Sequence, residues 1–233
     1  MVHISEDFVK DRVEELKNRD DVVAVGVVGS YARSPDNDHN DLDIFAIVDG
    51  KWMKRKTEVV KGVPIEYFFN SIEKAKEWLN GEDWWKNYHW YTNCKVIYDP
   101  EEKFDDLKKE AERVKEDRLD LTDEDLEEMA YEIWDARKDL ETDDVAQKRY
   151  MLNSSFDDLI RMHYLLEGEV PVKKNFRVKH LKEFSGYMYK LAQDFLLASS
   201  TMEKENKLEK MIEHVSKELP DTAPEWETEK EGN

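Results

Sequence analysis

Hydrophobic and polar residues follow two different patterns along this chain, and the change comes near residue 100. Before it, short apolar runs rich in Val, Ile and Phe predict strands near 22–28, 41–48, 57–60, 63–69 and 95–98. Amphipathic helices are predicted over 6–18, with Ser5 as N-cap, and over 71–79. Residues 1–100 are therefore expected to form a small domain built on a mixed sheet.

From residue 101 onward the apolar positions recur at helical spacing. Helices are predicted near 101–117, 123–140, 143–167 and 187–218, the last broken around residues 199–201. We therefore expect an all-α helical bundle over 101–219, and an α+β fold class for the whole chain. The remaining segment, 220–233, is polar and mostly acidic, which predicts a disordered tail.

The net charge of −19 limits the classes of partner. Residues 101–233 carry most of it, with 22 Lys and Arg against 36 Asp and Glu. Because nonspecific affinity for nucleic acid comes mostly from Lys and Arg on phosphates, we expect no long nucleic acid as a partner. The same charge would attract a polycation.

Compartment signals are few. No apolar run has the length of a membrane span, and residues 1–10 lack the basic and apolar regions of a signal peptide. Cys94 is the single cysteine, so no internal disulfide can form. The sequence predicts a cytoplasmic protein with no membrane partner.

The chemistry is concentrated in two neighbouring motifs. An apolar run ends in Gly29-Ser30, where Gly29 allows backbone to pass close to a ligand and Ser30 is expected to cap a short helix facing an anion such as phosphate. After a polar loop, Asp41 and Asp43 open the next strand. Alternation along a strand points both carboxylates the same way, and paired oxygen ligands favour Mg²⁺, with Mn²⁺ as the alternative.

A third carboxylate, Glu66, lies in an otherwise apolar strand, where an unpaired charge would be costly. We expect it to complete the metal site. The alternative is a glutamate on the exposed face of an edge strand, next to Pro64.

These three motifs together resemble the signature of the DNA polymerase β-type nucleotidyltransferase superfamily. With the helical half, the chain is similar to the kanamycin nucleotidyltransferase-like branch, which includes aminoglycoside and lincosamide adenylyltransferases. The resemblance implies an enzyme that transfers AMP from ATP, or NMP from another NTP, to a hydroxyl of a small molecule, releasing pyrophosphate. An aminoglycoside-type antibiotic is one expected acceptor.

The resemblance and the residues themselves together predict roles for single residues. Two Mg²⁺ ions would lie on Asp41, Asp43 and Glu66, which are the expected catalytic residues. Nucleotide phosphates would contact Gly29, Ser30, Arg33 and, from the basic segment 171–181, Lys174. The general base would be Glu66 or a bundle carboxylate such as Glu132 or Asp135. An alternative for the basic segment is that it balances an acidic bundle.

Two other functions stay open. Residues 29–33, Gly-Ser-Tyr-Ala-Arg, match a motif of protein-modifying, toxin-neutralising antitoxins, although those chains are usually shorter and lack a large bundle. A non-catalytic nucleotide-binding module is the second alternative. The aromatic segment 84–91 is interpreted as core packing or a homodimer contact, with a stacking surface for a nucleobase as the alternative.

Overall fold

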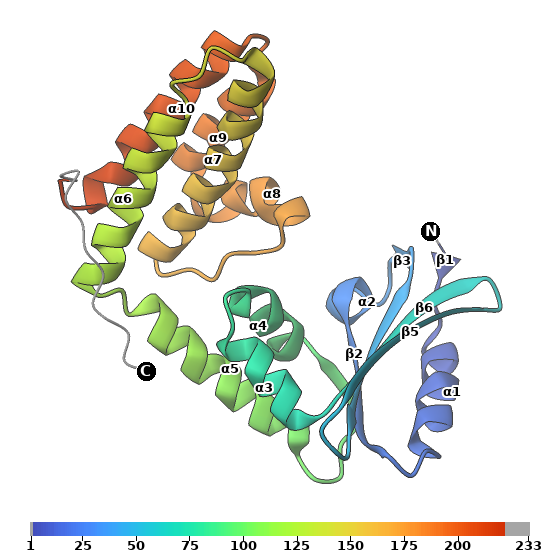
Figure 1. The fold of residues 1–233 in the computed structure, drawn as a ribbon. Coiled ribbons are helices and arrows are strands. Elements are labelled where there is room, and N and C mark those ends of the chain that lie inside the picture. Colours follow the sequence, from blue (N-terminus) through green and yellow to red (C-terminus); the bar gives the residue numbers. More distant parts are fainter. Residues whose placement is uncertain (1, 222–233) are drawn as a thin grey trace. The chain divides into compact units, whose positions relative to one another are not determined.

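The computed structural model describes residues 2–221 and divides the chain into two compact units, Met1–Asp117 and Arg118–Asn233. Figure 1 shows strands confined to the first unit and helices alone in the second, which confirms the predicted α+β class. Of the predicted acidic tail, 222–233 lies outside the described residues. Within residues 2–221, no helix combines the length and apolar character needed to cross a membrane.

A five-stranded sheet forms the centre of the first unit. Its strands, in spatial order, are β5 (Met53–Val60), β6 (Val63–Asn70), β4 (Leu42–Val48), β2 (Val22–Val28) and β7 (Lys95–Tyr98). The β4–β6 pair is parallel and the other pairs are antiparallel, so the sheet is mixed, as predicted. A small second sheet pairs β1 (Val2–His3) with β3 (Asp38–His39).

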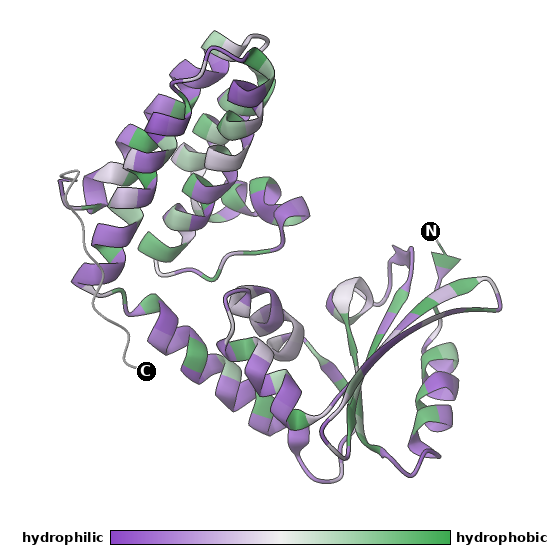
Figure 2. Cartoon of the chain, in the orientation of Figure 1, coloured by the Kyte–Doolittle hydropathy of each residue, from purple (hydrophilic) through white to green (hydrophobic). Residues whose placement is uncertain are grey.

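Each face of the main sheet is covered by helix. On one face lies α1 (Glu6–Lys17), whose apolar stripe of Val9, Val13 and Leu16 packs in one core with alternate residues of β2, β4 and β6. Ser5 accepts a hydrogen bond from the backbone of Phe8, confirming the predicted N-cap. Figure 2 shows β2 and β4 apolar along most of their length, whereas the edge strand β5 is mostly hydrophilic.

The opposite face carries α3 (Ile72–Asn80), α4 (Trp84–Thr92) and α5 (Lys103–Leu119). Phe45 of β4 packs edge-to-face on Tyr91 of α4 and on Phe104 of α5. Because Phe104 is fully buried in this contact, α5 belongs to the first unit for nearly all its length. The first unit thus extends to Asp117, whereas the sequence placed the boundary at 100, where the last strand ends.

The second unit is a bundle with its own core. Its helices are α6 (Asp123–Asp139), α7 (Val145–Leu166), α8 (Lys174–Phe184), α9 (Gly186–Leu197), α10 (Thr201–Val215) and the 3-10 turn η1 (Ser216–Glu218). The core includes the stacked rings of Phe156 and Phe195, whose centroids are 4.5 Å apart. The predicted helix 187–218 is interrupted at 198–200, close to the expected break, and α8 was not predicted as a helix.

Candidate active site

The turn that ends β2 brings backbone directly against a carboxylate. Gly29 has φ +73°, a left-handed conformation that side chains rarely adopt. A Cβ built on Gly29 would lie 2.1 Å from Oδ2 of Asp43, far inside van der Waals contact. The β2–β4 register, which pairs Val28 with Asp43, produces this approach. Position 29 is therefore restricted to glycine by both its conformation and the carboxylate beside it.

Ser30 lies in the short helix α2 (Gly29–Arg33) and has a different role from the expected one. The N-cap of α2 is Val28, so the prediction that Ser30 caps this helix is wrong, because the helix begins one residue earlier, at Gly29. The Ser30 hydroxyl lies 3.0 Å from Nδ1 of His39. Nε2 of His39 lies 3.0 Å from the Ser34 carbonyl, which can only accept, so Nε2 donates and Nδ1 accepts from Ser30.

His39 was not expected to be a site residue. It is 5 % exposed and packs edge-to-face on Tyr31, with ring centroids 5.4 Å apart. Through its two hydrogen bonds it holds Ser30 on the loop that leads to Asp41. Its only signal in the sequence is a position beside the Asp41-Leu42-Asp43 motif, since a single histidine in a polar loop predicts no contact by itself.

The sheet register brings two of the predicted carboxylates side by side. Asp43 of β4 and Glu66 of β6 are Cα partners in the parallel pair, so their side chains leave the same face of the sheet. Asp41 precedes β4 rather than opening it, two residues before Asp43. All three residues are partly buried. This arrangement places like charges on neighbouring strands, where they favour a cation.

The edge-strand interpretation of Glu66 is wrong. Strand β6 is paired on both sides, with β5 and β4, so it is an interior strand of the sheet and not an edge strand. The Glu66 side chain is 29 % exposed and accepts a hydrogen bond from Arg55 of β5 at 2.5 Å. Glu66 therefore has a cationic partner within the protein itself.

The carboxylates of Asp41, Asp43 and Glu66 are the right chemical type of ligand for a hard cation, but they are not grouped closely enough to bind one. Carboxylate oxygens without a sulfur or imidazole ligand suit Mg²⁺ or Mn²⁺. Over residues 2–221, however, no three His, Cys, Asp or Glu side chains are grouped closely enough to hold a metal ion. Glu66 is directed to Arg55 instead. A metal ion at these carboxylates would therefore share Glu66 with a cationic partner that is already in place.

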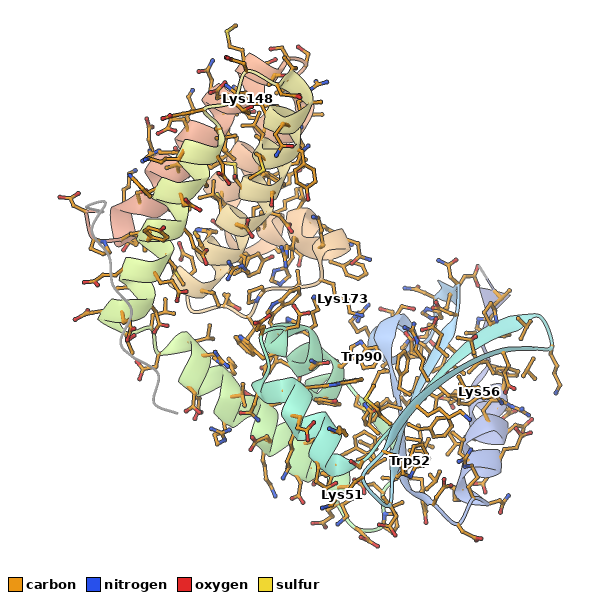
Figure 3. All side chains as sticks on the ribbon, viewed as in Figure 1. Lys51, Trp52, Lys56, Trp90, Lys148 and Lys173 are labelled. Carbon is orange, nitrogen blue, oxygen red and sulfur yellow. The ribbon has the colours of Figure 1, made fainter. Side chains whose placement is uncertain are left out.

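The aromatic segment forms α4, which packs on the carboxylate-bearing face of the sheet. Trp84, Trp85 and Tyr91 are buried. Trp90 packs edge-to-face on Phe68, with ring centroids 4.4 Å apart, and Phe68 shares its strand face with Glu66. Figure 3 labels Trp90 on this side of the sheet. Most of the segment therefore builds the core, and its Trp90 end borders the strand that carries Glu66.

The remaining predicted residues lie in the second unit. Lys174 is exposed and pairs with Asp157 at 3.2 Å. Arg177, only 4 % exposed, pairs with the same carboxylate at 2.8 Å and donates to the Val172 carbonyl. The basic segment thus balances an acidic residue inside the bundle, as its alternative interpretation expected. A phosphate contact for Lys174 stays a prediction.

Glu132 and Asp135 line a pocket of about 250 Å³ between α6, α7 and α10. Asp139, Asp158, Ser155 and Arg161 also line it. Glu132 pairs with Arg161 at 3.2 Å. Desolvation in the pocket raises the pKa of Glu132 and of Asp158, against the opposing influence of Arg161. Carboxylates outnumber cations here, so a positively charged ligand would be stabilised.

Comparison with known proteins agrees with this architecture. No protein-family model matches the chain, and a search of curated proteins finds no match. Among solved structures, a nucleotidyltransferase-like protein from Exiguobacterium sibiricum 255-15 is similar, with a TM-score of 0.53 and 14 % identity over 90 % of this chain and 73 % of that one. At this identity the similarity shows the fold alone. The chain shares the fold of that protein, whereas nucleotidyl transfer and the kanamycin-type branch stay predictions.

Proposed function

We propose that this protein is a Mg²⁺-dependent nucleotidyltransferase that moves AMP from ATP to a hydroxyl of a small molecule and releases pyrophosphate. One observation carries the proposal: the Gly29 turn lies against Asp43, and Asp43 is in register with Glu66. A glycine turn beside paired carboxylates supplies a phosphate contact and a cation site within one surface. The nucleotidyltransferase-like fold supports the same reaction class.

Metal binding and phosphate binding are assigned to different residues of the first unit. Asp41, Asp43 and Glu66 would hold the metal ions, which, when bound, lower the pKa of the attacking hydroxyl and neutralise the triphosphate. Backbone N–H groups of the Gly29 turn would bind the β- and γ-phosphates, and the exposed Arg33 would add a further contact. The Ser30 hydroxyl donates to Nδ1 of His39, so it would have to turn away from His39 before it could donate to a phosphate oxygen.

The reaction is an in-line displacement. The acceptor oxygen attacks the α-phosphorus, the bond from the α-phosphorus to the bridging oxygen breaks, and pyrophosphate leaves with that electron pair. The acceptor's proton passes to a carboxylate, for which Glu66 is the candidate within the first unit.

A cationic acceptor, such as an aminoglycoside-type compound, is the acceptor class that we favour. The second half of the chain carries the larger acidic excess, and the pocket between α6, α7 and α10 gathers four carboxylates with one guanidinium. Such a surface concentrates cations and its effect decreases with salt. A protein acceptor is the second candidate, favoured by the Gly-Ser-Tyr-Ala-Arg motif at 29–33.

The test measures pyrophosphate release with ATP, GTP, CTP and UTP across pooled aminoglycosides, neutral hydroxylated compounds and candidate proteins. We expect release with ATP, Mg²⁺ and a cationic acceptor, reduced about 100-fold or more in Asp41→Asn and in Asp43→Asn. Asp41→Asn should keep the wild-type melting temperature or exceed it, because it removes like-charge repulsion.

Asp49→Asn is the matched control, since Asp49 follows the other end of β4 and its side chain accepts a hydrogen bond from the backbone of Gly50. It should release pyrophosphate at the wild-type rate. Full activity in Asp43→Asn would overturn the site. Release with neutral or protein acceptors alone would keep the reaction and overturn the cationic acceptor.

A further inference from the structure

Arg55 is held beside Glu66 by two contacts. Its Nη2 donates to Oε2 of Glu66 at 2.5 Å, and its guanidinium carbon lies 5.0 Å from the ring centroid of Phe68. Phe68 is the Cα partner of Arg55 across the β5–β6 pair, and Trp90 supports its ring from α4. Arg55, whose side chain is 62 % exposed on the edge strand, is thus held beside Glu66 by its contact with the Phe68 ring.

The next residue on the strand provides a comparison inside the same molecule. Lys56 pairs with Glu58 at 2.5 Å and lies 5.2 Å from the ring of Tyr67. Its Cα partner is Tyr67, so it occupies the opposite face from Arg55; Figure 3 labels Lys56 there, across the sheet from Trp90. The two cations therefore make the same kinds of contact, one carboxylate and one aromatic ring each.

The difference between the two pairs is what lies beyond the carboxylate. Glu66 is the Cα partner of Asp43, so its charge is opposite a second carboxylate on the next strand. Glu58 lies on the edge strand, and its Cα partner is the apolar Ile65. Arg55 thus neutralises one member of a carboxylate pair that would otherwise repel. A metal ion on Glu66 would serve the same purpose through the same carboxylate.

We infer that Arg55 is a positioning residue that holds Glu66 in the metal-free protein and competes with the metal ion for it. This rests on the proposed function, because it assumes that Glu66 is a metal ligand. The competition would lower metal affinity. Glu66 would leave the guanidinium when it binds a metal ion, and Arg55 would then be available to an anionic partner.

The experiment titrates Mn²⁺ into the full chain without nucleotide, by calorimetry and by the electron paramagnetic resonance signal of free Mn²⁺. An exposed ion pair contributes little, so Arg55→Ala should tighten Mn²⁺ binding by a modest factor, about two- to fivefold. Lys56→Ala, which removes the same charge from the other face, should leave it unchanged. Arg55→Lys keeps the charge and should lie between wild type and Arg55→Ala.

A double-mutant cycle separates direct competition from a general charge effect. In a Glu66→Gln background, Arg55→Ala should give no gain in Mn²⁺ affinity, because the shared carboxylate is gone. Equal gains from Arg55→Ala and Lys56→Ala, or a gain that persists in the Glu66→Gln background, would overturn the inference while leaving the metal site intact. Mn²⁺ binding that is absent throughout, or unaffected by Asp43→Asn, would instead contradict the proposed function.

Discussion

At the scale of single residues, Gly29 has the most constrained position in the candidate site. The sequence predicts only that a glycine after a strand lets backbone approach a ligand. In the structure, the group that it approaches is a side chain of the same protein, the carboxylate of Asp43. Any Cβ at this position would force the Asp43 carboxylate to move. The glycine therefore sets the carboxylate geometry as well as the turn.

Gly29→Ala should accordingly lose both stability and activity. The matched control is Gly62→Ala in the β5–β6 turn, since Gly62 has a similar φ of +81° but open space where its Cβ would lie. Backbone strain alone costs about 1 kcal/mol or more, which both variants share. We expect the larger loss of unfolding free energy, and loss of pyrophosphate release, in Gly29→Ala only. Urea denaturation with the release assay checks this; equal losses in both variants would contradict the Asp43 contact.

Other residues of the site could not be foreseen from the chain. Asp41 and Asp43 can be predicted from their spacing at the start of one apolar run, and Glu66 from its place in another apolar run. Arg55 and His39 act through partners on other segments, Glu66 and Ser30, and those pairings depend on strand register and on the path of a loop. Neither the strand register nor the loop path can be read from a local sequence pattern. The contacts of Arg55 and His39 could therefore not be predicted from the sequence.

At the scale of elements, helix and strand periodicity predicted most of the architecture, and the misses have physical causes. Helix α8 begins in the basic run 173–179, which has weak amphipathic character. One of its two buried positions is filled by Arg177, where the pattern would require an apolar residue, and the charge of Arg177 is compensated by Asp157. An ion pair thus occupies a position where helix prediction relies on a buried apolar residue, and this is why α8 was not predicted.

Helix α5 was assigned to the bundle because its sequence is helical, but its contacts connect it to the first unit. Asn80, at the end of α3, donates to Glu110 at 3.1 Å, and Arg113 donates to both Glu110 and Asn80. The hydrogen bonds from Arg113 and Asn80 lower the pKa of Glu110 to about 2. A carboxyl whose pKa is lower in the folded than in the unfolded protein stabilises the fold at pH values above its unfolded-state pKa. That stabilisation is lost as pH falls through its folded-state pKa.

Glu110→Gln should therefore destabilise the first unit by about 1 kcal/mol or less at pH 7, because the network is partly screened by solvent. The difference from wild type should shrink as pH falls from about 4.5 toward 2, where the wild-type carboxyl becomes neutral too. Glu116→Gln, on the exposed side of the same helix, is the control and should have no effect. Thermal unfolding from about pH 7 to about pH 2.5 checks it; a constant difference at all pH values would contradict the network.

At the scale of the whole molecule, two units with separate cores carry different titrating groups. The second unit buries His163, 3 % exposed, with Nε2 2.8 Å from the Ser185 hydroxyl. Burial and the neighbouring His214 lower the pKa of His163 to about 4, although Glu167 lies 3.8 Å from Nδ1. The unfolded state binds the proton more readily, so stability decreases as pH falls below about 6.5 and the loss is complete near pH 4.

The two units should thus respond differently to mild acid. Between about pH 7.5 and about pH 5 the second unit should lose about 2 kcal/mol of unfolding free energy, while Glu110 in the first unit stays ionised. Hydrogen exchange read by mass spectrometry, corrected for intrinsic rates, assigns the loss to each unit. His163→Gln, which can still bond to Ser185, should flatten the pH dependence of the second unit, and His3→Gln, on the exposed β1 strand, should not. Equal protection of the bundle at both pH values would show that His163 is protonated in the folded protein, against the effect of its burial.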